Sequence, residues 1–414
     1  MQSSRVAAFI LPQFSHHFLE VLMKKIILAA VASALIAGPA AADGHDVKLG
    51  VIFGFTGPIE SLTPPMADAA EMAMKEVTDS GAFMNGSSVT AVRADSTCTD
   101  AAAATAGAER MITSDGISAI VGADCSGVTI AVLQNVAMAK GMVMISPSAT
   151  SPALSDMEDN GLFFRTAPSD AREGQVVAEM LKEKGYNSVA LTYTNNDYGK
   201  GLADAIQSNF ESMGGSITIV TAHEEGKGDY SAEVGALAQA GGDLLVVAGY
   251  LDQGGKMIIQ GSLDAGSFDT FFLPGGMIGD SLPTAIGSDL NGSFGVVAGT
   301  DSPGAAMMSK IVGSELGPFV GESYDAAALI MLAMQAAGST DSSDFAAKVL
   351  DVANAPGEKI YPGELAKGLK ILAGGGEIDY VGASAVELIG GGESAGNYRE
   401  IVVEGAKNKT VGYR

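Results

Sequence analysis

Short runs of apolar, β-branched residues alternate along this chain with longer segments that repeat apolar residues at helical spacing. The pattern begins with residues 47–53, which read as a strand, and residues 66–77, which read as an amphipathic helix. Alternation of this kind is typical of parallel sheets, because each return to a parallel strand needs a connection about as long as a helix. We therefore predict an α/β protein built on parallel, doubly wound sheets.

The alternation occurs in two sets, and this indicates two lobes. The first set has predicted strands at residues 47–53, 89–94, 119–122 and 143–145. The second has predicted strands at residues 188–193, 217–221, 244–248, 271–273 and 295–298, followed by a last one at 398–403. Helical spacing predicts helices at residues 66–77, 100–111, 127–139, 170–184, 199–213, 230–240 and 324–337. A chain of 414 residues is too long for one ordinary core and suits two.

The first 42 residues read as a targeting signal with an upstream extension at residues 1–22. Met23 and two lysines precede an apolar run at residues 26–37, and small residues lead up to Asp43. This order is that of a secretory signal peptide. The run is too short to span a membrane, which takes roughly 20 residues. We predict cleavage near Asp43, export to the periplasm and no stable membrane insertion.

Composition narrows the choice of partners. The formal net charge is −24, which disfavours nucleic acid and anionic membranes as partners. The two cysteines, Cys98 and Cys125, favour a disulfide over two buried free thiols if the protein is exported. Cysteine and histidine do not cluster in the sequence, so we expect no metal site and no cofactor.

Hydroxyl side chains follow two of the predicted strands in the first set. Ser126 follows the third strand, and the run Ser148, Ala149 and Thr150 follows the fourth. Ligands of open parallel sheets bind at the carboxyl ends of strands, where hydroxyls and free backbone N–H groups can hold a carboxylate. Ordinary capping of the following helices is the alternative interpretation.

Two tyrosines occupy corresponding places in the second set. Tyr198 follows the first strand of that set, and Tyr250 follows a later one. Both should face the cleft between the lobes unless they are half-buried loop aromatics. The sequence contains no P-loop or H-E-x-x-H motif, so we predict a binding protein rather than an enzyme.

Several segments, taken in order, resemble a known family. They are residues 47–51 with Thr56-Gly57-Pro58, residues 95–98, 121–126 and 144–152, Asp197-Tyr198-Gly199, and Gly249-Tyr250. The mature chain resembles the periplasmic binding proteins of the branched-chain amino-acid (Leu/Ile/Val-binding) type, which are receptors of ABC transporters. The resemblance implies a type I periplasmic binding protein fold, in which two Rossmann-like lobes are joined by a three-strand hinge. It places lobe one at residues 43–167 and 301–382, and lobe two at residues 168–300 and 383–414.

The resemblance also implies roles for individual residues. It implies a disulfide between Cys98 and Cys125. The α-carboxylate of an amino acid would be held by Ser126, Ser148 and Thr150, in the loop that also contains Ala149. Tyr198 and Tyr250 would help to close the second lobe, and Leu62 would face the ligand side chain.

One departure from the family concerns the ligand's ammonium group. Leucine-binding members hold it with a glutamate in lobe two, and the matching position here is Gly275 or Gly276. They also carry a large aromatic residue in place of Leu62. Asp325, at the start of an Ala-rich helix, is our first candidate for a substitute partner, and Glu60, in the first loop, is the second. Their ordinary interpretations are a carboxylate that complements a helix dipole and a solvated loop charge.

These observations predict a monomeric periplasmic receptor that passes an amino acid or an amino-acid-like molecule to an ABC transporter permease. A receptor for an amide, a urea-like compound or an aromatic acid is the alternative within the same fold. A sensory ligand-binding module is a third possibility, which the predicted signal peptide disfavours.

Overall fold

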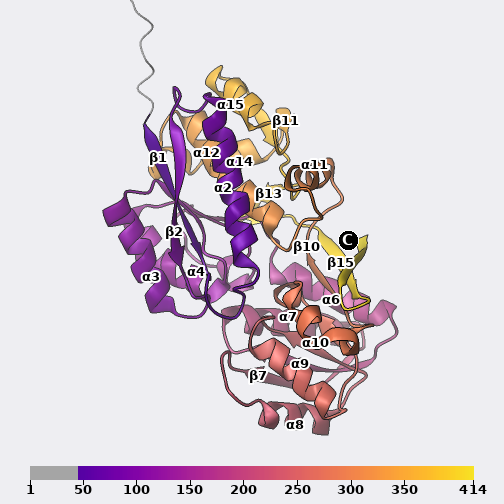
Figure 1. Cartoon of the computed structure of the whole chain (residues 1–414). Helices are drawn as coiled ribbons and strands as arrows, with labels where there is room; N and C mark the ends of the chain where they lie inside the picture. Colours follow the sequence, from indigo (N-terminus) through magenta and orange to yellow (C-terminus); the bar gives the residue numbers. More distant parts are fainter. Residues whose placement is uncertain (1–44) are drawn as a thin grey trace, which may run out of the picture. The chain divides into compact units, whose positions relative to one another are not determined.

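Two parallel sheets carry the fold, as the alternation of strands and helices predicts (Figure 1). The computed structural model describes residues 45–414, so the signal peptide predicted within residues 1–42 lies outside the described residues. The first sheet has the strand order β2-β1-β3-β4-β5, with every pair parallel. Its strands are β1 (Asp46–Phe53), β2 (Ser88–Asp95), β3 (Ala119–Gly122), β4 (Met144–Ser146) and β5 (Phe163–Arg165).

Helices cover both faces of the first sheet, and this explains why β3 is buried at every position. In Figure 1, α3 and α4 lie on one side of β1 and β2, while α2 and α12 pack together on the other. The bounds are α2 (Thr63–Ser80), α3 (Ala101–Arg110), α4 (Ser126–Val132), α5 (Met138–Lys140) and α12 (Val320–Ala337). The carboxylate of Asp100 caps α3 by accepting hydrogen bonds from the backbone N–H groups of Ala102 and Ala103.

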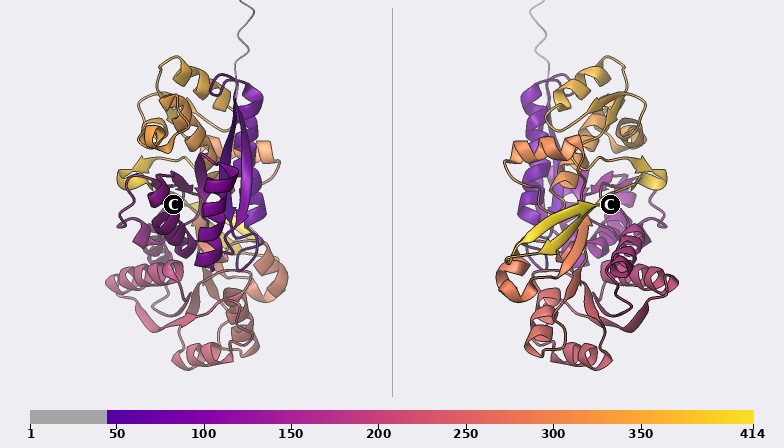
Figure 2. Two further views of the ribbon diagram at one scale, coloured as in Figure 1. Left: turned by 90° about the vertical axis from the view of Figure 1, so that its left-hand side faces the viewer. Right: turned by 90° about the vertical axis from the view of Figure 1, so that its right-hand side faces the viewer.

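The second sheet repeats the topology of the first and then extends it. Its order is β16-β15-β10-β9-β8-β6-β7, so its five parallel strands follow the same winding as β2-β1-β3-β4-β5. Figure 2 shows the two C-terminal strands beside β10, where β15 pairs antiparallel with β10 and β16 pairs antiparallel with β15. The strands are β6 (Ser188–Thr194), β7 (Ser216–His223), β8 (Leu244–Ala248), β9 (Phe271–Leu273), β10 (Phe294–Ala298), β15 (Tyr398–Val403) and β16 (Asn408–Tyr413).

The helices of the second lobe form two packed pairs, α6 with α7 and α8 with α9. Both pairs contact strands of the second sheet. The bounds are α6 (Asp170–Glu183), α7 (Asp197–Ser212), α8 (Ser231–Ala240), α9 (Gly254–Asp264) and α10 (Ser281–Ile286).

After β10 the chain returns to the first lobe, because α12 packs against α2, α14 and α15. It then crosses again to join the second sheet at β15. The chain therefore passes between the lobes three times, as expected for a three-strand hinge. The exact lobe boundaries, at residues 167, 301 and 382, stay a prediction. The elements of this return are α11 (Pro303–Val312), α13 (Ser342–Phe345), α14 (Lys348–Ala353), β11 (Glu358–Ile360), α15 (Leu365–Ala373), β12 (Ile378–Tyr380), β13 (Leu388–Ile389) and β14 (Glu393–Ser394).

The predicted disulfide is confirmed: Cys98 and Cys125 are joined, and they link the loops that follow β2 and β3.

Strand β16 was not expected from the sequence. It is an edge strand with partly exposed side chains, so its residues carry little of the apolar signal by which buried strands are recognised. Within residues 45–414, no helix has the length and apolar character that a membrane span requires.

Candidate functional site

The candidate site lies where both sheets reverse their winding. In the first sheet this switch point is between β1 and β3, and in the second it is between β6 and β8. Loops at such points diverge and leave a crevice at the carboxyl ends of the strands. A pocket occurs here, with walls from both lobes. Its lining residues are Ile59, Leu62, Met66, Asp124, Cys125, Ser126, Ser148, Thr150, Glu173, Tyr198, Tyr250, Gly275, Gly276 and Phe319.

The first lobe contributes the hydroxyl groups that the sequence singles out. Ser126, Ser148 and Thr150 all line the pocket. Ser126 begins α4, and its hydroxyl oxygen accepts a hydrogen bond from the backbone N–H of Ser151 at 3.1 Å. Ala149 belongs to the same loop but lies outside the pocket lining, and its N–H already donates to the Ser146 hydroxyl at 2.9 Å. The three residues therefore line one space, and the amide of Ala149 serves to hold the loop.

The second lobe contributes a stacked pair of tyrosines. The rings of Tyr198 and Tyr250 lie 5.1 Å apart at an interplanar angle of 17°. Tyr198 sits in the first turn of α7, which Asn196 caps by accepting from the Gly199 N–H at 3.0 Å. A Cβ at Gly199 would lie 2.2 Å from the carbonyl oxygen of Thr194, so only glycine lets the helix start this close to β6.

Gly275 and Gly276 both line the pocket, but they differ in the space around them. A Cβ at Gly276 would lie 2.5 Å from the Gly249 carbonyl oxygen and 2.7 Å from the Tyr198 hydroxyl, so no side chain fits there. A Cβ at Gly275 would meet Glu173 Oε2 at 3.4 Å, which is an ordinary contact. The acidic group at this place in the pocket is thus Glu173, from another element.

Glu173 lies in the first turn of α6, after the capping residue Ser169. Its Oε1 accepts a hydrogen bond from the Gly275 N–H at 2.9 Å, and the residue is only 4% exposed. Asp170 lies three residues earlier in the same turn and is fully buried, and within the described part of the chain neither of its carboxyl oxygens has a hydrogen-bond partner. Burial raises the pKa of both carboxyl groups, and the negative charge of Asp170 raises the pKa of Glu173 further.

Sequence reasoning did not find Glu173, because an acid in the first turn of a helix is usually explained by the helix dipole. A usable signal does exist. The predicted helix at residues 170–184 follows directly on the first crossing between the lobes, so its first turn has to face the cleft.

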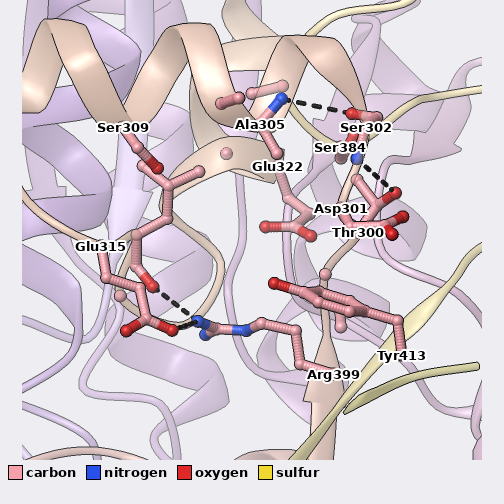
Figure 3. A pocket seen from close by; sticks show the side chains of 17 residues that line it. Thr300, Asp301, Ser302, Ala305, Ser309, Glu315, Glu322, Ser384, Arg399 and Tyr413 are labelled. Carbon is pink, nitrogen blue, oxygen red and sulfur yellow. Dashed lines mark hydrogen bonds and ion pairs between the residues drawn. The ribbon is translucent and has the colours of Figure 1, made fainter. Parts of the chain in front are cut away.

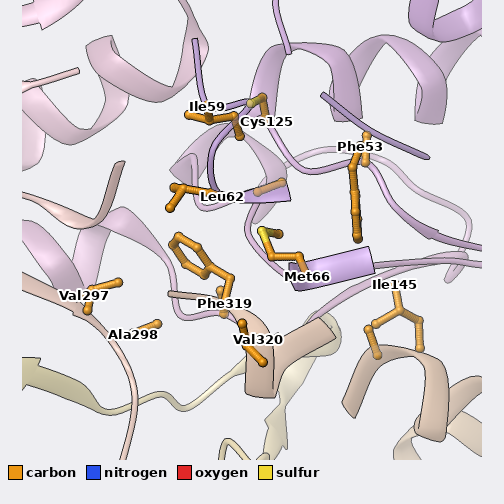
Figure 4. Packing of buried hydrophobic residues seen from close by; sticks show 14 of the residues in the cluster. Phe53, Ile59, Leu62, Met66, Cys125, Ile145, Val297, Ala298, Phe319 and Val320 are labelled. Carbon is orange, nitrogen blue, oxygen red and sulfur yellow. The ribbon is translucent and has the colours of Figure 1, made fainter. Parts of the chain in front are cut away.

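An apolar group closes one side of the pocket. Ile59, Leu62 and Met66 come from the segment after β1 and the start of α2, and Phe319 comes from the residue before α12. Figure 4 shows the ring of Phe319 directed toward Leu62 and Met66. Leu62 was predicted for this wall, whereas the aromatic contribution of Phe319 was not, because residue 319 is far from the first loop in sequence. This wall suits an apolar ligand side chain.

Glu60 and Asp325, the two predicted ammonium partners, do not line the pocket. Asp325 is fully buried and accepts four hydrogen bonds. Its donors are the Tyr380 hydroxyl, the Ala383 N–H, and the N–H and hydroxyl of Ser384. Glu60 is exposed in its loop. The expectation is therefore corrected: Asp325 fixes the segment after β12, and Glu60 is a solvated charge.

A larger hollow, of about 280 Å³, lies beside the segments that connect the lobes (Figure 3). Its lining includes Asp301, Glu315, Glu322 and Arg399. The guanidinium of Arg399 is already engaged, because Nη1 lies 3.2 Å from Glu315 and donates to the Leu316 carbonyl at 2.9 Å. This hollow lacks the hydroxyl loops of the first lobe, so we do not assign the main ligand site to it.

Direct contacts join the lobes around the rim of the pocket. The Ser61 N–H donates to Asp252 Oδ2 at 2.9 Å, and the Asp252 N–H donates to the Pro58 carbonyl at 3.0 Å. On another side, the Ser151 hydroxyl donates to the Asp197 carbonyl at 2.9 Å. These hydrogen bonds connect segments of the two lobes on two sides of the pocket. Within residues 45–414, no three His, Cys, Asp or Glu side chains cluster in a way that could hold a metal ion.

Comparison with known proteins agrees with this geometry. Residues 46–357 match the family model of the periplasmic binding proteins. A Leu/Ile/Val-binding protein homolog of Brucella melitensis is 31% identical over 337 residues, which cover 78% of this chain and 88% of that protein.

Solved structures are similar in fold. A leucine-binding protein of Thermotoga maritima has a TM-score of 0.75 at 19% identity, covering 89% of this chain and 98% of that one. A solute-binding protein of R. palustris in complex with benzoate has a TM-score of 0.69 at 17% identity, covering 89% of this chain and 96% of that one. At these identities the likeness bears on the fold alone.

Proposed function

Because this chain belongs to the periplasmic binding protein family, we propose that it is an exported receptor that captures an amino acid with an apolar side chain and delivers it to the permease of an ABC importer. Like its family and its relatives, it is a solute-binding protein and not an enzyme. The Brucella relative is named for binding leucine, isoleucine and valine, which favours ligands of that class.

One observation carries the proposal: three kinds of surface meet in a single pocket between the lobes. The hydroxyls of Ser126, Ser148 and Thr150 suit a carboxylate. The stacked rings of Tyr198 and Tyr250 give a flat second wall, and the apolar group around Leu62 suits a hydrocarbon side chain. An aliphatic amino acid presents these surfaces in the same compact arrangement.

Export supports the transport role. The basic, apolar and small-residue order of residues 23–42 supports secretion, and we propose the periplasm as the working compartment. N-terminal sequencing of protein purified from the native host should give a start at or near Asp43. Recovery of the chain with residues 1–42 intact would contradict this part of the proposal.

The ligand is tested by thermal unfolding with a panel of the twenty L-amino acids, simple amides, urea and aromatic acids. A true ligand at about 100 times its dissociation constant should add about 2.7 kcal/mol to the unfolding free energy. We expect aliphatic amino acids to give the largest upward shifts of Tm. A shift with benzoate or amides but with no amino acid would contradict the proposed ligand class.

A matched pair of variants locates the site. Ser126→Ala removes a pocket hydroxyl that accepts from the Ser151 N–H at 3.1 Å and keeps its own hydrogen for a ligand carboxylate, and it should weaken the best amino acid by about tenfold or more. Ser114→Ala, at an exposed hydroxyl outside the pocket lining, is the control and should leave affinity unchanged. Equal affinities for the two variants would count against the hydroxyl cradle.

A further inference from the structure

We infer that the Glu173 carboxylate is the partner of a ligand ammonium group, so that the pocket selects zwitterionic amino acids over carboxylic acids of the same shape. The inference rests on the proposed function and deepens it, because it names the second charged end that a ligand must carry. It also supplies the group that the glycines at positions 275 and 276 cannot supply.

The charge of the pocket lining is the first reason. Among residues 45–414, no Lys, Arg or His lines the pocket, whereas Asp124 and Glu173 do. Arg165, which ends β5 in the first lobe, pairs with Glu393 and donates to the carbonyl groups of Ala149 and Ser151. A plain carboxylate ligand would therefore find no cation among the side chains that line the pocket.

The two lining acids differ in what they already bind, and this is the second reason. Both oxygens of Asp124 are occupied, because Oδ2 accepts from the Gly54 N–H at 2.6 Å and Oδ1 accepts from the Ser96 hydroxyl at 2.8 Å. Glu173 accepts one hydrogen bond, from the Gly275 N–H, through Oε1. Glu173 Oε2 is thus the acidic acceptor in the pocket with capacity left for a new donor.

Position is the third reason. Glu173 comes from the second lobe, while the hydroxyls of Ser126, Ser148 and Thr150 come from the first. An α-amino acid carries its carboxylate and its ammonium on one carbon, so one end can bind each lobe. Such a ligand would join the lobes electrostatically, which is what a closing receptor requires.

The surroundings of Glu173 couple ligand binding to a change in the protonation of its carboxyl group. The groups that face it are Asp170 on its own helix, Tyr198 from α7 and Tyr398 from β15, with Asp124 and Tyr250 on the other walls. None of these is a cation, so burial and Asp170 favour the protonated carboxyl in the empty pocket. An arriving ammonium favours the carboxylate. Binding should then release the Glu173 proton to solvent, and the ammonium keeps its own three hydrogens.

The test is calorimetry on the full mature protein with two probes. One is the tightest-binding member of the L-amino-acid panel, and the other is the carboxylic acid of the same carbon skeleton without the amino group. Glu173→Gln keeps an oxygen that can accept from the Gly275 N–H, so the fold should survive. The matched control is Glu179→Gln on the same helix, outside the pocket lining, where the side chain accepts from Gln175 at 2.8 Å.

We expect Glu173→Gln to weaken the amino acid by about 30-fold or more, as for other buried charge pairs, and to leave the deaminated acid unchanged or bound more tightly. Glu179→Gln should match the wild type with both probes. Titrations of the wild type near pH 7, in buffers of different ionisation enthalpy, should show proton release with the amino acid only.

Each other result has a defined meaning. Equal affinity of the amino acid for the wild type and Glu173→Gln, or binding without proton release, would overturn the inference and leave the proposed function standing. If no amino acid binds the wild type, the proposed ligand class fails and the inference fails with it. If Glu173→Gln does not fold, the measurement of proton release by the wild-type protein tests the inference on its own.

Discussion

Two buried acidic sites in this protein look alike in sequence and differ in structure. Asp325 in α12 accepts four hydrogen bonds from the chain around it. Asp170 and Glu173 in α6 are similarly buried, yet within the described residues their carboxyl groups together accept one hydrogen bond, from the backbone N–H of Gly275. A carboxyl group with a full set of internal donors holds the fold together. One without them is costly to bury, and this marks a place where another molecule can supply the missing partner.

Replacement of Asp325, whose carboxylate accepts four hydrogen bonds, should have the largest effect on stability. Asp325→Ala would leave the Tyr380 hydroxyl, the Ala383 N–H and both donors of Ser384 without their acceptor. We expect a loss of unfolding free energy on the order of 3–5 kcal/mol, measured by urea denaturation. Glu60→Ala, at an exposed loop position, is the control and should change stability by less than about 0.5 kcal/mol. A loss below about 1 kcal/mol for Asp325→Ala would show that the hydrogen bonds of Asp325 do not stabilise the fold as this comparison requires.

Asp170 and Glu173, which lack such a set of donors, should affect how the stability of the protein depends on pH. Burial raises the pKa of Asp170 to about 7 and that of Glu173 to about 8, in each case above the ordinary carboxyl range. The folded protein therefore holds protons that the unfolded chain has already lost, and the stability that they contribute falls as pH rises from about 5 to about 8. Glu173→Gln removes one such group. Between these pH values the ligand-free variant should gain on the order of 1–3 kcal/mol relative to the wild type.

Urea denaturation of both proteins at pH 5 and pH 8 measures this difference, with Glu179→Gln as the reference for a surface change on the same helix. Parallel pH curves for the wild type and Glu173→Gln would mean that Glu173 is not held in a protonated state by its surroundings.

The two glycines beside Glu173 allow a finer test of the same wall. Gly276→Ala places a Cβ 2.5 Å from the Gly249 carbonyl oxygen, so Tyr198 or the backbone has to move. Gly275→Ala places its Cβ 3.4 Å from Glu173 Oε2, where it can fit. We expect Gly276→Ala to weaken amino-acid binding by about 1–2 kcal/mol and Gly275→Ala to have the smaller effect, as measured by calorimetry. The reverse order would show that the Tyr198 wall is not what shapes the site.

The smallest effect should come from the Tyr198 hydroxyl, which accepts from the Gly276 N–H at 3.2 Å. Tyr198→Phe keeps the stack on Tyr250 and removes only this acceptor. The expected loss is about 0.5–1.5 kcal/mol of unfolding free energy without ligand. Tyr186→Phe, at a ring stacked on Phe294 outside the pocket, serves as the control. A larger loss for Tyr186→Phe would argue that the hydrogen bond at Gly276 contributes little.

Most of the fold could be predicted because buried parallel strands appear in the sequence as continuous apolar runs. The strand at residues 244–248 and β8 coincide, and the predicted helix at residues 199–213 corresponds to α7 with a shift of two residues at its start. The edge strand β16 escaped because its side chains alternate between partly exposed and exposed positions. Loop motifs such as Ser126 and Tyr198 could be placed in the pocket because the carboxyl ends of parallel strands share one edge of a sheet.

The roles of the buried acidic residues could not be assigned from the sequence in this way. Asp325 and Glu173 both stand near the start of an apolar helix, and sequence alone does not reveal whether a distant segment brings donors to them. The donors of Asp325 come from residues 380–384, more than fifty positions away along the chain. Phe319 escaped for a similar reason, since it reaches the first loop only through the return of the chain to lobe one. Pairings of this range are set by packing and not by any local pattern.

The tyrosine stack in the pocket has a consequence for how binding can be observed. The sequence holds 10 tyrosines and 0 tryptophans, so no indole ring dominates the ultraviolet emission of the protein. Tyr198 and Tyr250 form part of the pocket wall beside Glu173, and any change of charge or solvent there alters their immediate surroundings. Capture of a solute should therefore change the intrinsic tyrosine fluorescence directly. The unlabelled protein can thus act as an optical reporter of its own occupancy.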